Sequence, residues 1–431
     1  MPADPTLTPC TWLPLVTKGE TLPTVDPAPT HVPPTATDTP AAPQTPAATL
    51  SPTNTPSPTP TTTETPIPTG QPSGEACVVH VHDDDATDWD SGNDYYGDYV
   101  NQAVVDGMVQ RGLQVLTGES SWAAIWGRLF SQVQTTGYQT GEKILIKVNL
   151  NNSTRNGGCL GTDNAIDALP QPVKALIGGL VAAGVSQDDI WIYDATKDGR
   201  IIPNRFRLPI ASTYPAVQFW GRGECSTVNP VSHGGHASLT VQFAKPQLTD
   251  RQLADLLHQA TYLINMPILK RHGISPVTLG FKNHFGSLNK IIRGGHDNLH
   301  DFIAPSEGLY DPFYSPLVDI YTNPNIRDKT ILVLGDGLFG AGGATLAPSP
   351  WTTFGNDYPN SLFFAIDPVA IDCVMADFVK AEWSYGMEHA YDYLFCAEEH
   401  GLGTCEGSRD NPGGDPRGSG YEDIDYRAET L

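Results

Sequence analysis

Three lysines lie close behind apolar runs that are typical of buried strands. Lys147 ends the run ILIK, Lys270 ends the run ILK, and Lys282 follows shortly afterwards. The carboxyl ends of parallel strands meet at one edge of a sheet, and ligands of α/β proteins bind there. Ammonium groups at that edge would hold a carboxylate, a phosphate or a developing oxyanion through charge-assisted hydrogen bonds. We therefore expect one anion-binding crevice; the alternative is that each lysine pairs with a structural aspartate.

Amide and imidazole side chains accompany these lysines. Asn149 and Asn283 each lie within two residues of a lysine, and His272 follows Lys270 by two positions. Imidazole titrates near neutral pH, so His272 is a candidate general base or metal ligand; the alternative is a histidine that is merely hydrogen-bonded. We predict catalytic roles for His272, Lys270 and Lys282, and ligand-binding roles for Lys147, Asn149, Asn283 and Asp336.

Carboxylates supply the remaining candidates. Asp336 lies between a predicted strand and a glycine-rich stretch, where it could anchor a lysine or a metal. His80 and His82 share one face of a predicted strand, and Asp83 and Asp85 follow them. Histidine with carboxylates ligates zinc or manganese, whereas carboxylates alone suit calcium or magnesium. We expect a structural role or a loose divalent-cation site there rather than a catalytic centre.

The stretch YLINMPILKRHGISPVTLGFKNHFGSL, from Tyr262 to Leu288, resembles the signature of the domain-of-unknown-function 362 family of bacteria and archaea. Members typically show Lys-x-His after a strand and Lys-Asn-x-x-Gly soon afterwards. The segments ILIKVNLN, ILVLGDGL and FFAIDPVAIDCVMADFV fit the same pattern in the expected order. The resemblance implies an α/β fold and candidate residues, but no settled activity. Some members carry a ferredoxin-type iron–sulfur insert, which this chain lacks.

Strand-like and helix-like segments alternate along the folded part of the chain. Apolar runs end near His82, Lys147 and Asp194, and the helical pattern PQPVKALIGGLVAAGV separates the last two. Such alternation is typical of a parallel sheet covered by helices. We predict an α/β fold with a mainly parallel sheet, helices on both faces, and an irregular insertion at residues 200–247. Helices are predicted for residues 99–110, 121–133, 250–260 and from Asp367 onwards.

Proline, threonine and alanine dominate residues 1–73. This segment has too little apolar side chain to offset the entropy of ordering, so we predict a disordered stalk or linker. Its composition is typical of O-glycosylated stalks, which favours an extracellular or cell-surface protein, although no signal peptide is visible. An α/β domain is predicted for residues 74–403 and a loosely ordered tail for residues 404–431.

Composition excludes several classes of partner and cofactor. The formal net charge of −23 would repel nucleic acid, and no apolar run is long enough for a membrane span. The seven cysteines include no Cys-x-x-Cys pair, which disfavours an iron–sulfur cluster or haem attachment; disulfides are expected if the protein is exported. Neither GxGxxG after a strand nor a P-loop is present, so a nucleotide is not expected.

Two functions remain open. The first is an exported enzyme or enzyme-like domain that binds a small anionic ligand, with a divalent metal as an optional cofactor. The second is a non-catalytic surface, matrix or filament-forming module on a glycosylated stalk, with self-association or cell-surface glycans as its partners. Lysines that are all tied up in salt bridges would favour the second function.

Overall fold

The computed structural model describes residues 76–153, 158–161, 164–195 and 201–431. The predicted stalk at residues 1–73 lies outside these ranges. All statements below concern the described residues.

One large mixed sheet organises the fold, with strands in the order β15-β1-β12-β11-β8-β2-β3-β4-β5. Neighbouring strands from β11 to β5 pair in parallel, and β12 lies antiparallel between β11 and β1. Strand β9 pairs with β11 and β10. The strands of this sheet are β1 (Ala76–His82), β2 (Ile144–Lys147), β3 (Ile190–Tyr193), β4 (Gln218–Gly221), β5 (Val228–Pro230), β8 (Tyr262–Asn265), β9 (Ile268–Arg271), β10 (Val277–Thr278), β11 (Thr330–Ala341), β12 (Ser361–Ala365) and β15 (Ile424–Thr430). Two small hairpins are formed by β6 (Thr240–Val241) with β7 (Arg251–Gln252) and by β13 (Gly407–Ser408) with β14 (Asn411–Pro412).

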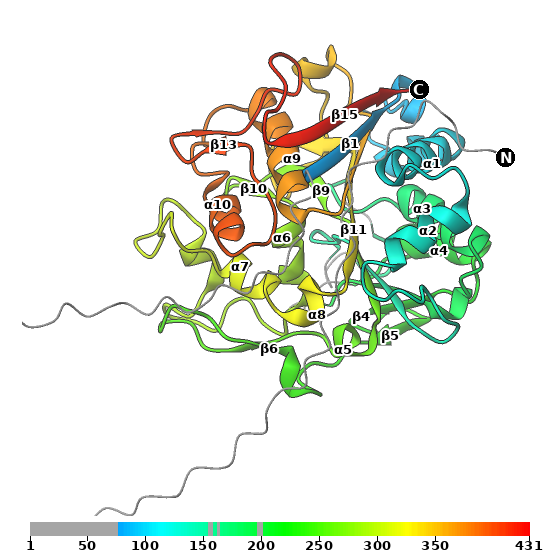
Figure 1. Ribbon diagram of the computed structural model, residues 1–431, viewed down its shortest axis with the longest axis horizontal. Coiled ribbons are helices and arrows are strands. Elements are labelled where there is room, and N and C mark those ends of the chain that lie inside the picture. Colours follow the sequence, from blue (N-terminus) through cyan, green and yellow to red (C-terminus); the bar gives the residue numbers. More distant parts are fainter. Residues whose placement is uncertain (1–75, 154–157, 162–163, 196–200) are drawn as a thin grey trace, which may run out of the picture. The chain divides into compact units, whose positions relative to one another are not determined.

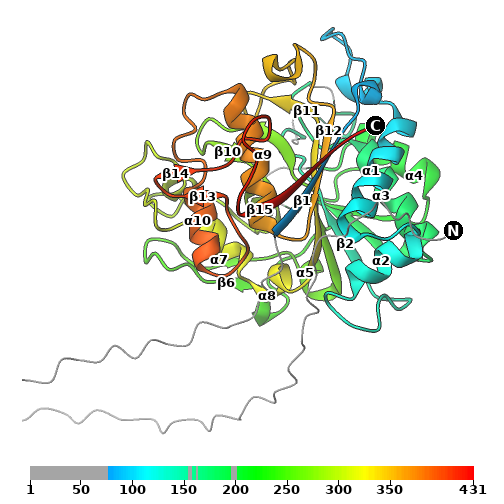
Figure 2. The ribbon, with the colours of Figure 1, turned by 45° about the horizontal axis from the view of Figure 1, so that its top comes forward.

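Helices cover both faces of the sheet, which confirms the predicted α/β architecture (Figures 1 and 2). One face carries α1 (Gln102–Thr117), α2 (Trp122–Phe130), α3 (Pro170–Ala182) and α4 (Asn204–Thr213). The other carries α5 (Leu256–Gln259), α6 (Gly280–Asn283), α7 (Pro316–Tyr321), α8 (Pro324–Arg327), α9 (Pro368–Glu382) and α10 (Asp392–Glu399). Within the described ranges, none of these helices is long and apolar enough to cross a membrane.

Alternating side chains of the strands feed two separate hydrophobic cores. In β2, Ile144 and Ile146 pack with the α1–α4 layer, whereas Leu145 packs with the α9 layer. Helix starts follow the expected capping chemistry. Ser121 accepts a hydrogen bond from Ala124 N at 3.3 Å, and Asp367 accepts two from the first turn of α9 at 2.8 and 2.9 Å.

Helix α1 runs past residue 110, the end predicted from the sequence, and is capped by Gly118, which has a left-handed φ of 71°. Gly112 instead lies inside the helix, facing the sheet. A Cβ there would come within 2.2 Å of the Phe364 ring on β12. The glycine therefore permits close helix–sheet packing rather than terminating the helix.

Three further segments differ from the sequence-based expectations. Residues 250–260 were expected to be one helix, but β7 precedes α5 because the buried Arg251 binds Asp297, 2.6 Å away. Residues 200–247, expected to be irregular, contribute α4 and extend the parallel sheet through β4 and β5. Residues 404–431, expected to be loosely ordered, end in β15 beside β1. The buried Glu406 orders this tail by accepting hydrogen bonds from the backbone N–H groups of residues 422, 423 and 424.

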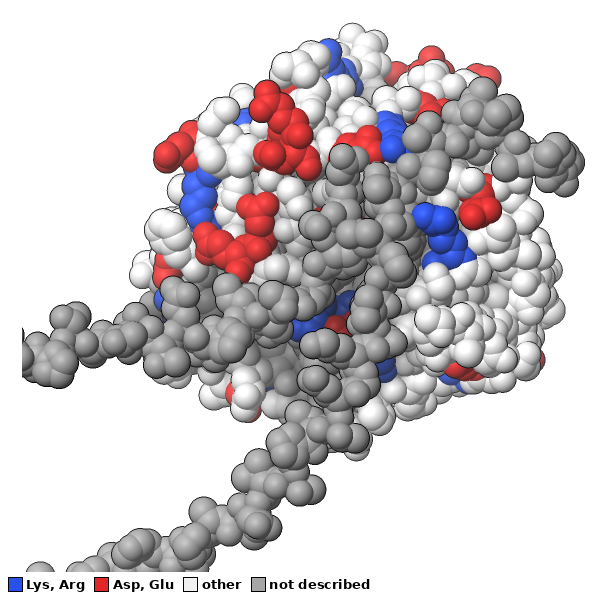
Figure 3. Space-filling model, in the orientation of Figure 1, with Lys and Arg blue, Asp and Glu red and all other residues white. Residues whose placement is uncertain are grey.

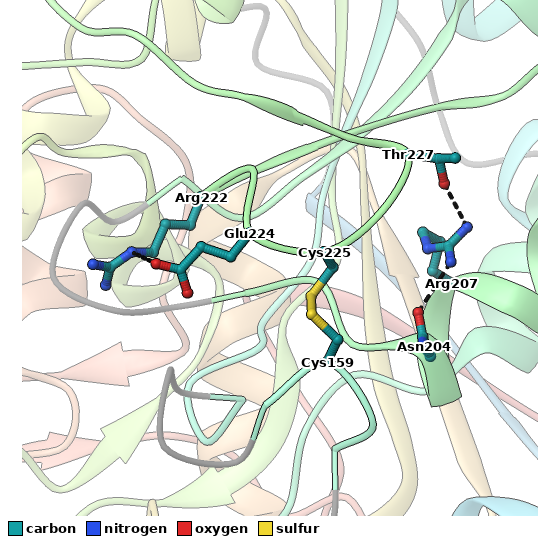
Figure 4. The surroundings of a disulfide bond; sticks show 7 residues. All are labelled: Cys159, Asn204, Arg207, Arg222, Glu224, Cys225 and Thr227. Atoms are coloured by element: carbon teal, nitrogen blue, oxygen red, sulfur yellow. Dashed lines mark hydrogen bonds and ion pairs between the residues drawn. A yellow bond between two sulfur atoms is a disulfide. The ribbon is translucent and has the colours of Figure 1, made fainter.

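A disulfide joins Cys159 to Cys225, two residues that are 66 positions apart (Figure 4). The second cysteine follows β4, and Arg207 of α4 binds Thr227 in the same loop at 2.6 Å. The bond therefore connects the loop after β2 to the last strands of the sheet. Its presence agrees with the expectation of disulfides in this chain.

Removing this disulfide should destabilise the fold. In the chain-entropy account, a closed loop of this length stabilises the folded state by about 4 kcal/mol. We expect the Cys159→Ala/Cys225→Ala double variant to lose about 2–4 kcal/mol of unfolding free energy in guanidinium titrations. Cys396→Ala, which removes a buried free thiol, is the control and should lose about 1 kcal/mol. An unchanged unfolding midpoint in the double variant would contradict this account.

Candidate active site

A cleft of about 440 Å³ lies at the carboxyl ends of β2, β3 and β9, beside α6. Five of the sequence-predicted residues line it together: Lys147, Asn149, His272, Lys282 and Asn283. Its other walls come from Asn151, Asp194, Thr278, Phe285, Gly286, Ile291 and His300. The parallel strands thus bring these side chains to one edge of the sheet.

Lys147 ends β2 and is fully buried. Its Nζ lies 3.3 Å from Asp194 Oδ1 and donates to Val148 O at 2.5 Å and to Asn283 Oδ1 at 3.2 Å. Asp194 Oδ2 in turn accepts from Leu150 N at 2.8 Å. A buried ammonium needs such partners because its desolvation costs several kcal/mol. For this lysine the alternative reading therefore holds: it pairs with a structural aspartate inside the protein.

Gly286 closes over this ion pair. A Cβ at this position would lie 2.3 Å from Asp194 Oδ1 and 2.5 Å from Lys147 Nζ. Its carbonyl also accepts a hydrogen bond from Ala195 N at 2.8 Å, which ties the segment after α6 to the exit of β3. The glycine of the Lys-Asn-x-x-Gly pattern is thus required for close approach to the paired charges.

The short helix α6 carries Lys282 and Asn283, and two buried polar residues fix its position. Asp372 of α9 accepts hydrogen bonds from Gly280 N at 2.6 Å and from Phe281 N at 3.1 Å. Burial raises the pKa of this carboxyl to about 7. Asn265, at the end of β8, accepts from Asn283 Nδ2 at 2.7 Å and donates to Gly280 O at 2.9 Å.

Lys282 differs from Lys147 because it has no carboxylate partner. Its side chain is only 6% exposed, and Nζ donates to Ser275 Oγ at 2.5 Å. No Asp or Glu in the described ranges lies within ion-pairing distance of it. Burial, reinforced by the charge of Lys270, holds its pKa well below the usual range for lysine. These surroundings therefore favour the uncharged form of the Lys282 amine.

Lys270 lies in the wall of the cleft rather than on its surface. It is fully buried, and its Nζ donates to Asn149 Oδ1 at 3.3 Å. Burial raises the pKa of the buried Asp167 to about 6, and the charge of Lys270 opposes this rise. Lys270 thus adds positive charge behind Asn149 and Lys282.

His272 is held in one tautomer by the backbone. Its Nδ1 accepts hydrogen bonds from Ile274 N at 3.0 Å and from Ser275 N at 3.2 Å. Because an N–H group can only donate, Nδ1 carries no proton, and the hydrogen of the neutral ring lies on Nε2. Burial lowers the pKa of His272 to about 2. At neutral pH His272 is therefore a hydrogen-bond donor to the cleft.

Other predicted residues lie away from this cleft. Asp336 is buried on β11, where Oδ1 accepts from Leu338 N at 3.2 Å and burial raises its pKa to about 7. His80 uses both ring nitrogens, with Tyr426 Oη and Ser361 Oγ each 2.8 Å away. His82 contacts the Pro359 carbonyl at 3.0 Å.

The predicted cation site gains no geometric support from the part of the chain that the structure describes. Asp83 caps a single 3-10 turn, and its Oδ1 accepts from Asp85 N at 2.9 Å. His82 Nε2 lies 2.9 Å from Asp84 Oδ1. No group of three or more His, Cys, Asp or Glu side chains in the described ranges is arranged to hold a metal ion. Metal binding by His80, His82, Asp83 and Asp85 stays a prediction.

Sequence reasoning missed three polar contributors to the site. Ser275 is the partner of Lys282, Asn265 positions α6, and the ring of His300 stacks near His272 with centroids 6.2 Å apart. The sequence could have indicated Asn265, because it is the one amide side chain in the buried strand YLIN. His300 belongs to the glycine-containing segment between α6 and α7.

Fold and cleft together define an α/β protein whose lysine, histidine and asparagine side chains gather at the carboxyl edge of parallel strands. A comparison with protein-family models matches residues 144–377 to the Domain of unknown function (DUF362). This match spans more than half of the 431 residues, and the chain belongs to the DUF362 family. All residues that line the cleft fall within the matched range. Searches of curated proteins and of solved structures found no match.

The Lys147–Asp194 pair should show strong energetic coupling. Asp194→Asn or Lys147→Met alone would leave one buried charge uncompensated, at a cost of about 3–5 kcal/mol. The double variant should cost clearly less than the sum, as measured by urea unfolding in a double-mutant cycle. Lys143 and Asp189 form a matched pair at the opposite ends of the same strands, where the lysine is 26% exposed. Their coupling should be about 1 kcal/mol or less. Equal coupling in both pairs would contradict the conclusion that Lys147 and Asp194 form a buried, strongly coupled ion pair.

His284 should make stability depend on pH. It is fully buried beside Lys147, and burial followed by that charge lowers its pKa to about 3. Between about pH 6.5 and pH 3 the unfolded chain binds a proton at this position that the folded chain does not, so stability falls as the pH falls. Relative to His284→Gln, the native chain should lose up to about 1.4 kcal/mol per pH unit in that window. Thermal unfolding at several pH values measures this, with the exposed His296→Gln as control.

Proposed function

We infer that the cleft binds a small anionic ligand, a carboxylate or a phosphate, and that the chain is an enzyme or enzyme-like domain. The observation that carries this proposal is the surplus of nitrogen donors in the cleft. Lys282, Asn283 and His272 line it, and Lys270 lies directly behind. Among the described residues of the lining, Asp194 is the one carboxylate, and Lys147 pairs with it. Not all lysines are tied up in salt bridges, which favours the ligand-binding alternative.

The charge of the whole chain strengthens this inference. The formal net charge is −23, and acidic side chains gather near α10 and β13 on the face shown in Figure 3. Burying several lysines costs free energy that specific hydrogen bonds must offset, and a purely structural domain has no need for this arrangement. An anion in the cleft would receive charge-assisted hydrogen bonds in a partly desolvated site, where they are strongest.

Each side chain has a distinct part in this proposal. Lys147 is a positioning residue, because its charge is already paired and its hydrogen bond orients Asn283. Asn283 and Lys282 meet the ligand. His272 acts as a neutral donor to a ligand oxygen and not as the general base expected from the sequence, because its Nδ1 is committed to the backbone.

An extracellular or cell-surface location is part of the proposal. Disulfides form and persist in oxidising compartments, and the Cys159–Cys225 bond supports such a location together with the Pro/Thr-rich composition of residues 1–73.

Calorimetric titration with phosphate, propionate and succinate tests the proposal. Binding should be accompanied by proton uptake, because an anion favours the charged form of Lys282, so affinity should fall as the pH rises. Lys282→Met should weaken the binding of the best anion by about 10- to 100-fold, the loss expected for a hydrogen bond to a charged group. The nearby exposed Lys290→Met is the matched control and should bind like the native chain. If no anion binds, or both variants bind alike, the proposal fails.

A further inference from the structure

Lys282 lies between two cavities of different character. On one side is the polar cleft, and on the other is a cavity of about 400 Å³. Apolar and aromatic side chains dominate the second cavity, including Val277, Phe302, Tyr314 and Leu317. Polar groups such as Asp311 and Asp392 complete its lining, but within the described ranges the hydrogen bond of the Lys282 amine goes to Ser275 Oγ at 2.5 Å.

The positive charge of Lys270 near this amine affects the reactivity of the amine. A lysine becomes a nucleophile when it is desolvated or when another cation lies beside it, because both conditions keep its nitrogen lone pair free. Lys282 meets both conditions, since it is buried and Lys270 lowers its proton affinity further. Ser275 holds the nitrogen in place, and its own hydroxyl donates to Val277 O at 3.1 Å, so Oγ accepts from the amine.

We propose that Lys282 is a nucleophilic catalytic residue that forms an imine with the carbonyl carbon of a small oxo acid. This inference rests on the proposed anion binding, since the carboxylate of the oxo acid is the anion that the cleft would hold. Asn283 and the positive charge of Lys270 stabilise that carboxylate, while the carbonyl carbon meets Lys282 Nζ.

The step balances with one proton from the solvent. The Nζ lone pair attacks the carbonyl carbon, the C–N bond forms as the C=O π bond breaks, and one amine proton moves to the oxygen to give a neutral carbinolamine. A proton from the solvent then allows that oxygen to leave as water while the remaining nitrogen lone pair forms the C=N bond of an iminium. His272 lines the cleft, and its Nε2–H group makes no hydrogen bond within the described part of the chain, so it can donate to the developing negative charge on oxygen. The iminium then withdraws electrons from the neighbouring bonds of the substrate, which is the purpose of such an intermediate.

Reductive trapping tests the proposal on the full chain. Pyruvate and acetoacetate, a 2-oxo and a 3-oxo acid, are incubated with the protein and sodium cyanoborohydride near pH 7, and the intact mass and peptide map are recorded. We expect one reduced adduct, located on Lys282 in the native protein, at a rate that changes little between pH 7 and pH 9. Exposed lysines keep a pKa of about 10.4, so their labelling should rise steeply over the same range.

Two variants make the result specific. Lys282→Arg keeps nitrogen hydrogen-bond donors at this position but cannot form an imine, so the adduct should disappear, whereas Lys290→Arg should be labelled like the native chain. Peptide mapping of the native protein gives the same answer even if Lys282→Arg does not fold. Labelling spread over exposed lysines, or no adduct at all, overturns the inference. Propionate, which has no carbonyl, separates the two failures: if it binds without any adduct forming from the oxo acids, anion binding stands and imine formation falls.

Discussion

The burial of the Lys147 ammonium at the end of the central strand β2 constrains everything around the cleft. A charge in that position requires a countercharge from the next strand, Asp194, and an amide oxygen from Asn283. It also excludes any side chain at residue 286. Desolvation of one ammonium group costs several kcal/mol when it is unpaired, more than half of the net stability of a small domain. The loops that close the site are therefore held in position by the pairing of this buried charge as well as by hydrophobic packing.

The opposite side of the cleft depends on contacts between segments that are distant in sequence. Asp372 of α9 receives the first two N–H groups of α6, and Asn265 of β8 clamps the last residue of that helix. A four-residue helix has too few internal hydrogen bonds to be stable alone, so its geometry comes from these partners. Because Lys282 and Asn283 lie on that helix, helix α9 positions the chemistry although none of its own residues lines the polar cleft.

Much of the fold could be predicted because it depends on local patterns. Apolar runs such as ILIK and IWIY and the Asp-Pro start of α9 indicated the parallel sheet and its helices. The gathering of Lys147, Asn149, His272, Lys282 and Asn283 followed from strand ends meeting at one edge. What could not be predicted depends on pairing: Gly112 packs on a ring more than two hundred residues away, and the tautomer of His272 is set by the backbone of a turn. Asp336 ends outside the cleft because β11 continues well beyond it.

The pairing of β1 has a consequence for the order in which the protein can assemble during synthesis. Strand β1 comes first in the described chain, yet its two neighbours, β12 and β15, are among the last elements to be made. Until they emerge from the ribosome, both edges of an apolar strand remain open to pairing with other chains. The last residues therefore complete the sheet. A chain that stops after α10 would retain every described cleft residue but would leave the β15 side of β1 unpaired. Strand β15, which contributes no described residue to the cleft lining, thus covers one edge of β1 that would otherwise be open to pairing with other chains.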